Sequence, residues 1–85
     1  MSERSPELTA AGREELAALE AELSRSEKAL RRVEARYAEE KPRYDRERRE
    51  FPQVAEQEAQ EIRAIGRTRA RIEQVRERIA FLRQQ

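Results

Sequence analysis

Two runs of apolar residues at heptad spacing constrain this chain more than any other feature. In the first run, alternating steps of three and four residues lead through Leu16, Leu19, Leu23, Ser26, Leu30, Val33, Tyr37, Glu40 and Tyr44. In the second run they lead through Phe51, Val54, Glu58, Glu61, Ile65, Thr68, Ile72, Val75, Ile79 and Leu82. A repeat of this period places an apolar seam along one side of a helix. The pattern therefore predicts an all-α chain of two coiled-coil helices.

A segment bounded by prolines, KPRYDRERREFPQV at 41–54, separates the two runs. Proline removes a backbone donor and clashes with the preceding turn, so the first helix should end or kink at Pro42. Pro52 suits the first turn of a second helix. We expect a single antiparallel hairpin over residues 1–85, with helix 1 at about 9–41, a tip at about 42–52 and helix 2 at about 53–84.

The start of the first helix has two candidate signals. Thr9 is a favourable N-cap residue and precedes the apolar run. Ser5 followed by Pro6 is a competing start, because proline is favoured at the first helical position.

Pairing residues whose numbers sum to 98 aligns the two seams, with Leu16 beside Leu82 at the base. Residues 1–30 carry four basic and seven acidic groups, net −3, whereas residues 62–85 carry seven and two, net +5. An antiparallel hairpin brings these complementary ends together. The seam becomes polar toward the turn, where Glu40 faces Glu58, so we expect a firm base and a half-mobile tip. The register centres the turn near Arg49.

Composition excludes several classes of protein. Charged residues make up 44% of the chain, and there is no cysteine and no histidine. The chain therefore has no disulfide or thiolate chemistry, and it lacks the usual metal ligand and general base. We expect a protein that is not an enzyme and binds no metal or cofactor. No apolar run approaches the roughly 18 residues that span a bilayer, which favours a soluble, cytoplasmic protein with no membrane association.

The tip holds the candidate functional residues, because loops at the end of a rigid scaffold often carry function. The candidates for chemistry at the tip are Asp45, Glu47, Glu50 and Gln53. The candidate partner contacts are Arg43, Tyr44, Arg46, Arg48, Arg49 and Phe51. Direct nucleic-acid binding is not favoured, since the net charge is only +1 and the tip offers few aromatic rings for stacking.

The opening LTAAGREELAALEAEL at 8–23 resembles the N-terminal coiled-coil domain of the Gre transcript-cleavage factors, which begins Leu-Thr-x-x-Gly and continues into a Leu/Glu-rich helix. At the tip, EFPQVAE at 50–56 can be laid on the family's Asp-Leu-x-Glu-Asn-Ala-Glu. After a one-residue shift, Gly66 and the Arg71-Ile72 pair fall where the family tends to have Gly and Arg-Ile.

This resemblance implies a finger that enters the secondary channel of bacterial RNA polymerase, where two tip acids help to hold a second Mg²⁺ and activate water. Glu50 stands for the first acid, but Gln53 stands where the second should be, and Val54 replaces the Asn. The first arm is several residues longer than usual, and the family's globular C-terminal domain is absent from the sequence. A neutral amide supplies none of the charge that a hard cation prefers. Mg²⁺ is therefore expected at the tip only if cleavage activity is retained.

Two functional hypotheses follow. The first is a Gre-like finger that binds RNA polymerase and modulates elongation, as an activator or an inhibitor, without full cleavage stimulation. The second is a structural or adaptor coiled coil that self-associates or docks onto a protein partner, because so narrow a core is marginal alone. The sequence leaves open an intramolecular hairpin or a swapped dimer, and a complete protein or a detached domain.

Overall fold

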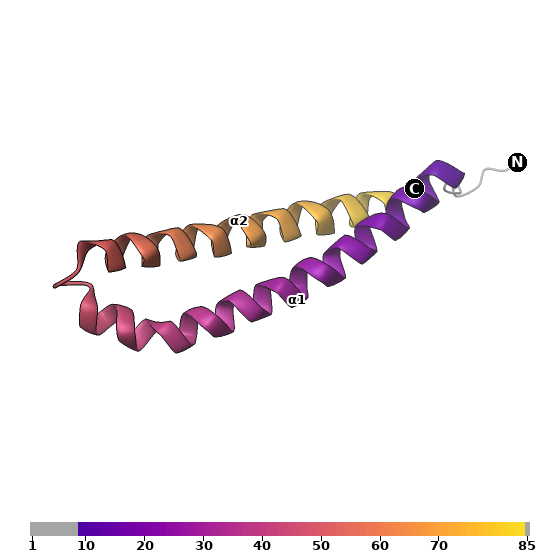
Figure 1. Cartoon of the computed structure of the whole chain (residues 1–85). Coiled ribbons are helices and arrows are strands. Elements are labelled where there is room, and N and C mark those ends of the chain that lie inside the picture. Colours follow the sequence, from indigo (N-terminus) through magenta and orange to yellow (C-terminus); the bar gives the residue numbers. More distant parts are fainter. Residues whose placement is uncertain (1–8, 85) are drawn as a thin grey trace, which may run out of the picture.

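The computed structural model of the chain describes residues 9–84, which form two long antiparallel helices joined by a short turn (Figure 1). Helix α1 spans Ala10–Glu47 and helix α2 spans Pro52–Arg83. The predicted all-α helical hairpin is confirmed. The Cα atoms extend over 71 × 15 × 15 Å, so the hairpin is a thin rod.

The N-terminus of α1 is capped as the Thr9 signal predicted. Thr9 adopts an extended backbone conformation, and its hydroxyl oxygen accepts a hydrogen bond from the Gly12 N–H at 3.0 Å. This contact satisfies one of the free donors of the first turn. The competing start at Ser5 lies outside the described residues.

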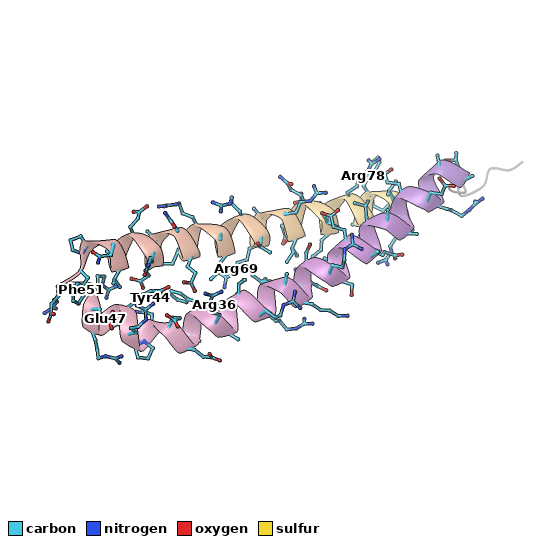
Figure 2. The ribbon with its side chains drawn as sticks, in the orientation of Figure 1. Arg36, Tyr44, Glu47, Phe51, Arg69 and Arg78 are labelled. Atoms are coloured by element: carbon cyan, nitrogen blue, oxygen red, sulfur yellow. The ribbon has the colours of Figure 1, made fainter. Side chains whose placement is uncertain are left out.

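The expected end of the first helix near Lys41 was wrong, because α1 continues through Pro42 to Glu47. Ion pairs one turn apart support the helix beyond the proline: Lys41 binds Asp45 at 2.7 Å, and Arg43 binds Glu47 at 3.3 Å. The helix changes direction between the labelled Arg36 and Tyr44 (Figure 2), as a missing backbone donor allows. The segment between the helices shrinks to residues 48–51, and α2 begins at Pro52.

Five ion pairs across the hairpin fix the register. Each joins a glutamate of α1 to an arginine of α2: Glu15–Arg78, Glu22–Arg71, Glu20–Arg83, Glu27–Arg76 and Glu34–Arg69. In the first two pairs the residue numbers sum to 93, and in the other three they sum to 103. These values lie symmetrically on either side of 98, as expected for the two flanks of one seam. The predicted register is confirmed.

The core is the seam itself. On α2 the buried apolar residues are Val54, Ile65, Ile72, Val75, Ile79 and Leu82, all at predicted heptad positions. The heptad leucines of α1 are only half-buried, and Tyr44 is the one buried residue of α1 that the structure describes. Tyr44 lies near the turn and between the helices (Figure 2). Tyr44 and Val54 are therefore buried between the helices close to the turn, although the seam there also contains glutamates.

Candidate functional site at the tip

Part of the exposed surface of the tip consists of side chains without partners. The side chains of Arg46, Arg49 and Glu50 are exposed and form no ion pair or hydrogen bond among the described residues. Phe51 is 44% exposed and projects at the end of the hairpin (Figure 2). The unpartnered exposed side chains at the tip are therefore two cations, one carboxylate and one aromatic ring.

Beneath this surface lies a polar group of five side chains, Tyr37, Tyr44, Arg48, Glu58 and Glu61, which we call the tip cluster. At its centre the buried Glu58 is only 6% exposed. Its Oε2 accepts a hydrogen bond from the Tyr37 hydroxyl at 2.8 Å, and its Oε1 binds the Arg48 Nη1 at 2.5 Å. The Tyr37 hydrogen bond, followed by Arg48, lowers the pKa of Glu58. Glu58 is therefore a stable buried carboxylate.

Arg48 connects this cluster to the outer face of α1. Its Nη2 binds Asp45 at 2.9 Å, and Asp45 in turn binds Lys41 at 2.7 Å. The hydrogen bond from Lys41, more than the charge of Arg48, lowers the pKa of Asp45. Arg48 thus ties the last turn of α1 to Glu58 of α2, and this ion pair holds the two ends of the turn together.

A second tyrosine–carboxylate contact completes the tip cluster. The Tyr44 hydroxyl donates a hydrogen bond to Glu61 Oε2, and this bond, with burial, raises the pKa of Tyr44 to about 12. The other oxygen of Glu61, Oε1, is buried and lacks a hydrogen-bond partner in the described chain. The Arg43 guanidinium lies 5.0 Å from the centroid of the Tyr44 ring, a cation–π contact. Arg43 therefore covers the outer side of the cluster.

The structure divides the predicted tip residues into two groups. Asp45, Glu47, Arg43 and Arg48 are engaged in ion pairs, and Tyr44 is buried. Glu50, Gln53, Arg46, Arg49 and Phe51 are exposed. The four expected chemical candidates are therefore not brought together as one site.

Glu58 and Glu61 were not predicted as site residues. Both occupy heptad positions that normally hold apolar side chains, and the tyrosines in the facing run are the signal that could have identified them. The predicted meeting of Glu40 with Glu58 does not take the form of two facing carboxylates. Glu40 instead binds Arg43 at 2.5 Å.

Residues 9–84 contain no group of three acidic side chains arranged to hold a metal ion. Glu50 is the exposed acid of the turn, and its neighbour Gln53 is a neutral amide. A hard cation needs several oxygen ligands with negative charge.

Comparison of the chain with protein-family models, with curated proteins and with solved structures finds no match. The resemblance to the Gre coiled coil therefore rests on the residues of the opening, the tip and the second helix. None of the helical segments described is both long and apolar enough to cross a bilayer.

Proposed function

We propose that this hairpin is a Gre-like finger that binds bacterial RNA polymerase through the secondary channel and modulates elongation without full stimulation of RNA cleavage. The opening at 8–23 supports the link to polymerase. The single structural observation that carries the proposal is the shape: a rod 71 Å long and 15 Å wide that exposes Arg49, Glu50 and Phe51 at its turn.

The tip cluster supports a probing role because it makes the end of the rod stiff. One oxygen of Glu58 binds Tyr37 of α1, and the other binds Arg48, which directly follows α1. Buried polar networks of this kind fix one geometry, because moving any member leaves a buried charge unpaired. Because this end is already ordered in the free hairpin, little conformational freedom is lost when the exposed turn enters a narrow passage.

The chemistry of the tip favours binding over cleavage. Arg46, Arg49 and Phe51 supply contacts that need no rearrangement of the hairpin, since none of their side chains holds an internal ion pair or hydrogen bond. A cleavage site of the Gre type needs two acids, whereas the chain has Glu50 and the neutral Gln53. Occupation of the channel is therefore the proposed mode of action.

Binding is tested by fluorescence anisotropy of the labelled chain with bacterial core polymerase. The variant Arg46→Ala/Arg49→Ala/Phe51→Ala should weaken the affinity at least about tenfold, since each lost interface contact contributes on the order of 1 kcal/mol. The control Arg32→Ala/Arg67→Ala/Ile62→Ala removes the same kinds of exposed side chain away from the turn and should bind normally. No binding of the wild-type chain at low salt would refute the proposal.

Cleavage is tested on backtracked transcription complexes with end-labelled RNA. The wild-type chain should add little to the cleavage by polymerase alone, and Asp45→Ala/Glu47→Ala/Glu50→Ala should change cleavage little. Gln53→Glu supplies the second carboxylate and should raise cleavage above the wild-type level. Strong cleavage by the wild type that the triple variant abolishes would show that the tip is catalytic.

A second candidate function is that of an adaptor coiled coil that docks a partner helix. The observation in its favour is apolar surface outside the tip: Ile62 is 50% exposed, Phe81 49% and Val33 36%. Chemical crosslinking in lysate followed by identification of the captured helix tests this candidate. A strict monomer in sedimentation, with no crosslinked partner, would exclude it.

A further inference from the structure

The heptad phase of α1 continues without interruption into α2. From Tyr44, a step of three reaches Glu47 and a step of four reaches Phe51, and Val54 then continues the series of α2. A hairpin does not require this continuity, because each helix can turn its own seam inward in any phase. Every seam position from Leu16 to Leu82 therefore belongs to one register, as in a single long helix.

The backbone of the turn contains no left-handed residue that would fix the chain reversal. Arg48 is still helical, with φ −55° and ψ −36°, and no described residue has positive φ. The N–H groups of Glu50 and Phe51 both bond to the Glu47 carbonyl, at 3.1 and 2.9 Å. A reversal held by a left-handed glycine would resist straightening. This reversal depends on the extended Phe51, with φ −124° and ψ 99°, before Pro52.

We propose that two copies of the chain exchange their α2 helices and form an antiparallel, two-stranded coiled coil in which residues 48–51 join α1 and α2 into one helix. The register places Arg49 at the two-fold axis, because paired residue numbers sum to 98. Each pair within the hairpin then recurs between the two copies, such as Glu20 with Arg83 and Tyr44 with Glu61. The exchange does not depend on polymerase binding.

The second copy also covers apolar surface that the hairpin leaves open. Phe51 is 44% exposed, yet it occupies a seam position of the continuous repeat. In the exchanged form it lies opposite Glu47 of the second copy, where the aliphatic part of that side chain can pack on the ring. Burial of an aromatic side chain at both symmetry-related sites favours the dimer.

Pro52 opposes the exchange. In the hairpin it occupies the favoured first position of α2, whereas in a continuous helix its ring clashes with the Arg48 carbonyl. Pro42 shows that α1 already accommodates one proline with a change of direction. The balance should therefore depend on concentration. The dimer has no turn, so exchange removes the exposed tip. A chain can therefore be a monomeric hairpin or part of the exchanged dimer, but not both at once.

A disulfide test separates the two forms, since the sequence contains no cysteine. The variant Ser26→Cys/Ile72→Cys places thiols at paired seam positions, whose numbers sum to 98. The reduced full chain is equilibrated from micromolar to millimolar concentration, oxidised, and run on a denaturing gel without reductant. An intrachain bond gives a monomer band, whereas exchange gives a covalent dimer from the same cysteine pair.

We expect the covalent dimer fraction to rise with concentration, in step with the dimer seen by sedimentation of the unmodified chain. Adding Pro52→Ala should raise the dimer association constant about 100-fold for each chain relieved of an interior proline. Insertion of four Gly/Ser residues after Arg49 should return the population to monomer, with circular dichroism confirming that helix is retained. Intrachain bonds alone at every concentration in the Pro52→Ala background, or a sedimenting dimer with only intrachain bonds, would overturn the proposal.

Discussion

The half of the hairpin near the chain termini and the half near its turn place hydrogen-bond donors and carboxylates on opposite helices. In the first half, which we call the base, glutamates of α1 bind arginines of α2 on the surface. Toward the turn the donors lie on α1 and the carboxylates on α2, as in Tyr37–Glu58 and Tyr44–Glu61. The base encloses an apolar seam, whereas the seam at the tip contains the buried Glu58.

This difference shows two ways of aligning helices. Exposed ion pairs contribute little to stability, but they make a slipped or parallel pairing unfavourable by bringing like charges together. The tip cluster selects one alignment of the two helices, because its buried polar groups form their hydrogen bonds in that alignment alone. Because donors and carboxylates exchange helices along the hairpin, α1 and α2 match in one antiparallel register.

The largest single effect should come from the apolar seam of the base. Ile72→Ala removes a buried side chain, 3% exposed, and should lower the free energy of unfolding by about 3 kcal/mol. Ile62→Ala removes the same atoms at a position 50% exposed and should change it by less than about 1 kcal/mol. Urea denaturation at fixed protein concentration measures both. Equal losses in the two variants would show that the seam is not the core.

Acid should weaken both halves, because several carboxylates have lowered pKa values. Hydrogen bonds from arginine lower the pKa of Glu15 and Glu22 at the base, and that from Tyr37 leads the lowering for Glu58. Such groups add stability above their ordinary pKa of 4.5, and this is lost as the pH falls through the lower folded value. Thermal melts from pH 7 to 2 should show a falling Tm. Salt at 1 M screens the exposed ion pairs of the base and should reduce their share of the fall in Tm. The share that remains in 1 M salt comes from the buried Glu58, and Glu58→Gln should reduce it.

The tip cluster should respond to loss of one hydroxyl. Tyr44→Phe leaves Glu61 without a donor for Oε2 while Oε1 is already unpartnered, and should lower the free energy of unfolding by about 1–2 kcal/mol. In the wild type, stability held by the protonated Tyr44 is present below pH 10 and is lost as the pH rises toward about 12.

Denaturation between pH 7 and 12 tests this assignment. As the pH rises toward 12, Tyr44→Phe should lose less free energy of unfolding than the wild type, because it has no hydroxyl at position 44 to ionise. Tyr37→Phe keeps the Tyr44 hydroxyl and should still show this loss. Identical alkaline profiles for the wild type and Tyr44→Phe would contradict the assigned hydrogen bond.

Gly66 offers a smaller effect of opposite sign. It lies within α2, and a Cβ built on it meets no atom within 4 Å. Gly66→Ala should therefore raise the free energy of unfolding by up to about 1 kcal/mol, from helix propensity and a less flexible unfolded chain. The matched Ala64→Gly and Ala70→Gly variants should lower it by a similar amount. A loss of stability in Gly66→Ala would show that the position is packed in solution.

The smallest effect should come from one ion pair of the base. Glu27→Arg faces Arg76 with a like charge and should lower the free energy of unfolding by about 0.5 kcal/mol at low salt. Adding Arg76→Glu should restore the pair in reversed order. The difference should vanish in 1 M salt, where the screening length is about 3 Å. A salt-independent loss would indicate a packing defect in place of a charge effect.

Much of the fold follows from local and periodic signals in the sequence. The Thr9 cap depends on residues one turn away, and the register depends on a seam that only one alignment satisfies. The turn falls on 48–51, around the predicted centre at Arg49. The candidate site was less predictable, because heptad positions specify which residues face each other but not which side chains bond.

Only the tertiary structure decided the length of α1 and the contacts of the tip. Proline lowers helix propensity at Pro42, but the ion pairs and the burial of Tyr44 on α2 outweigh the missing hydrogen bond. The seam opposes Glu40 to Glu58, yet long side chains reach past the nearest layer. Glu58 is satisfied by Tyr37 and Arg48, and Glu40 by Arg43. The sequence determined a hairpin with its turn near Arg49, whereas packing decided which charged side chains at the tip are paired and which are exposed.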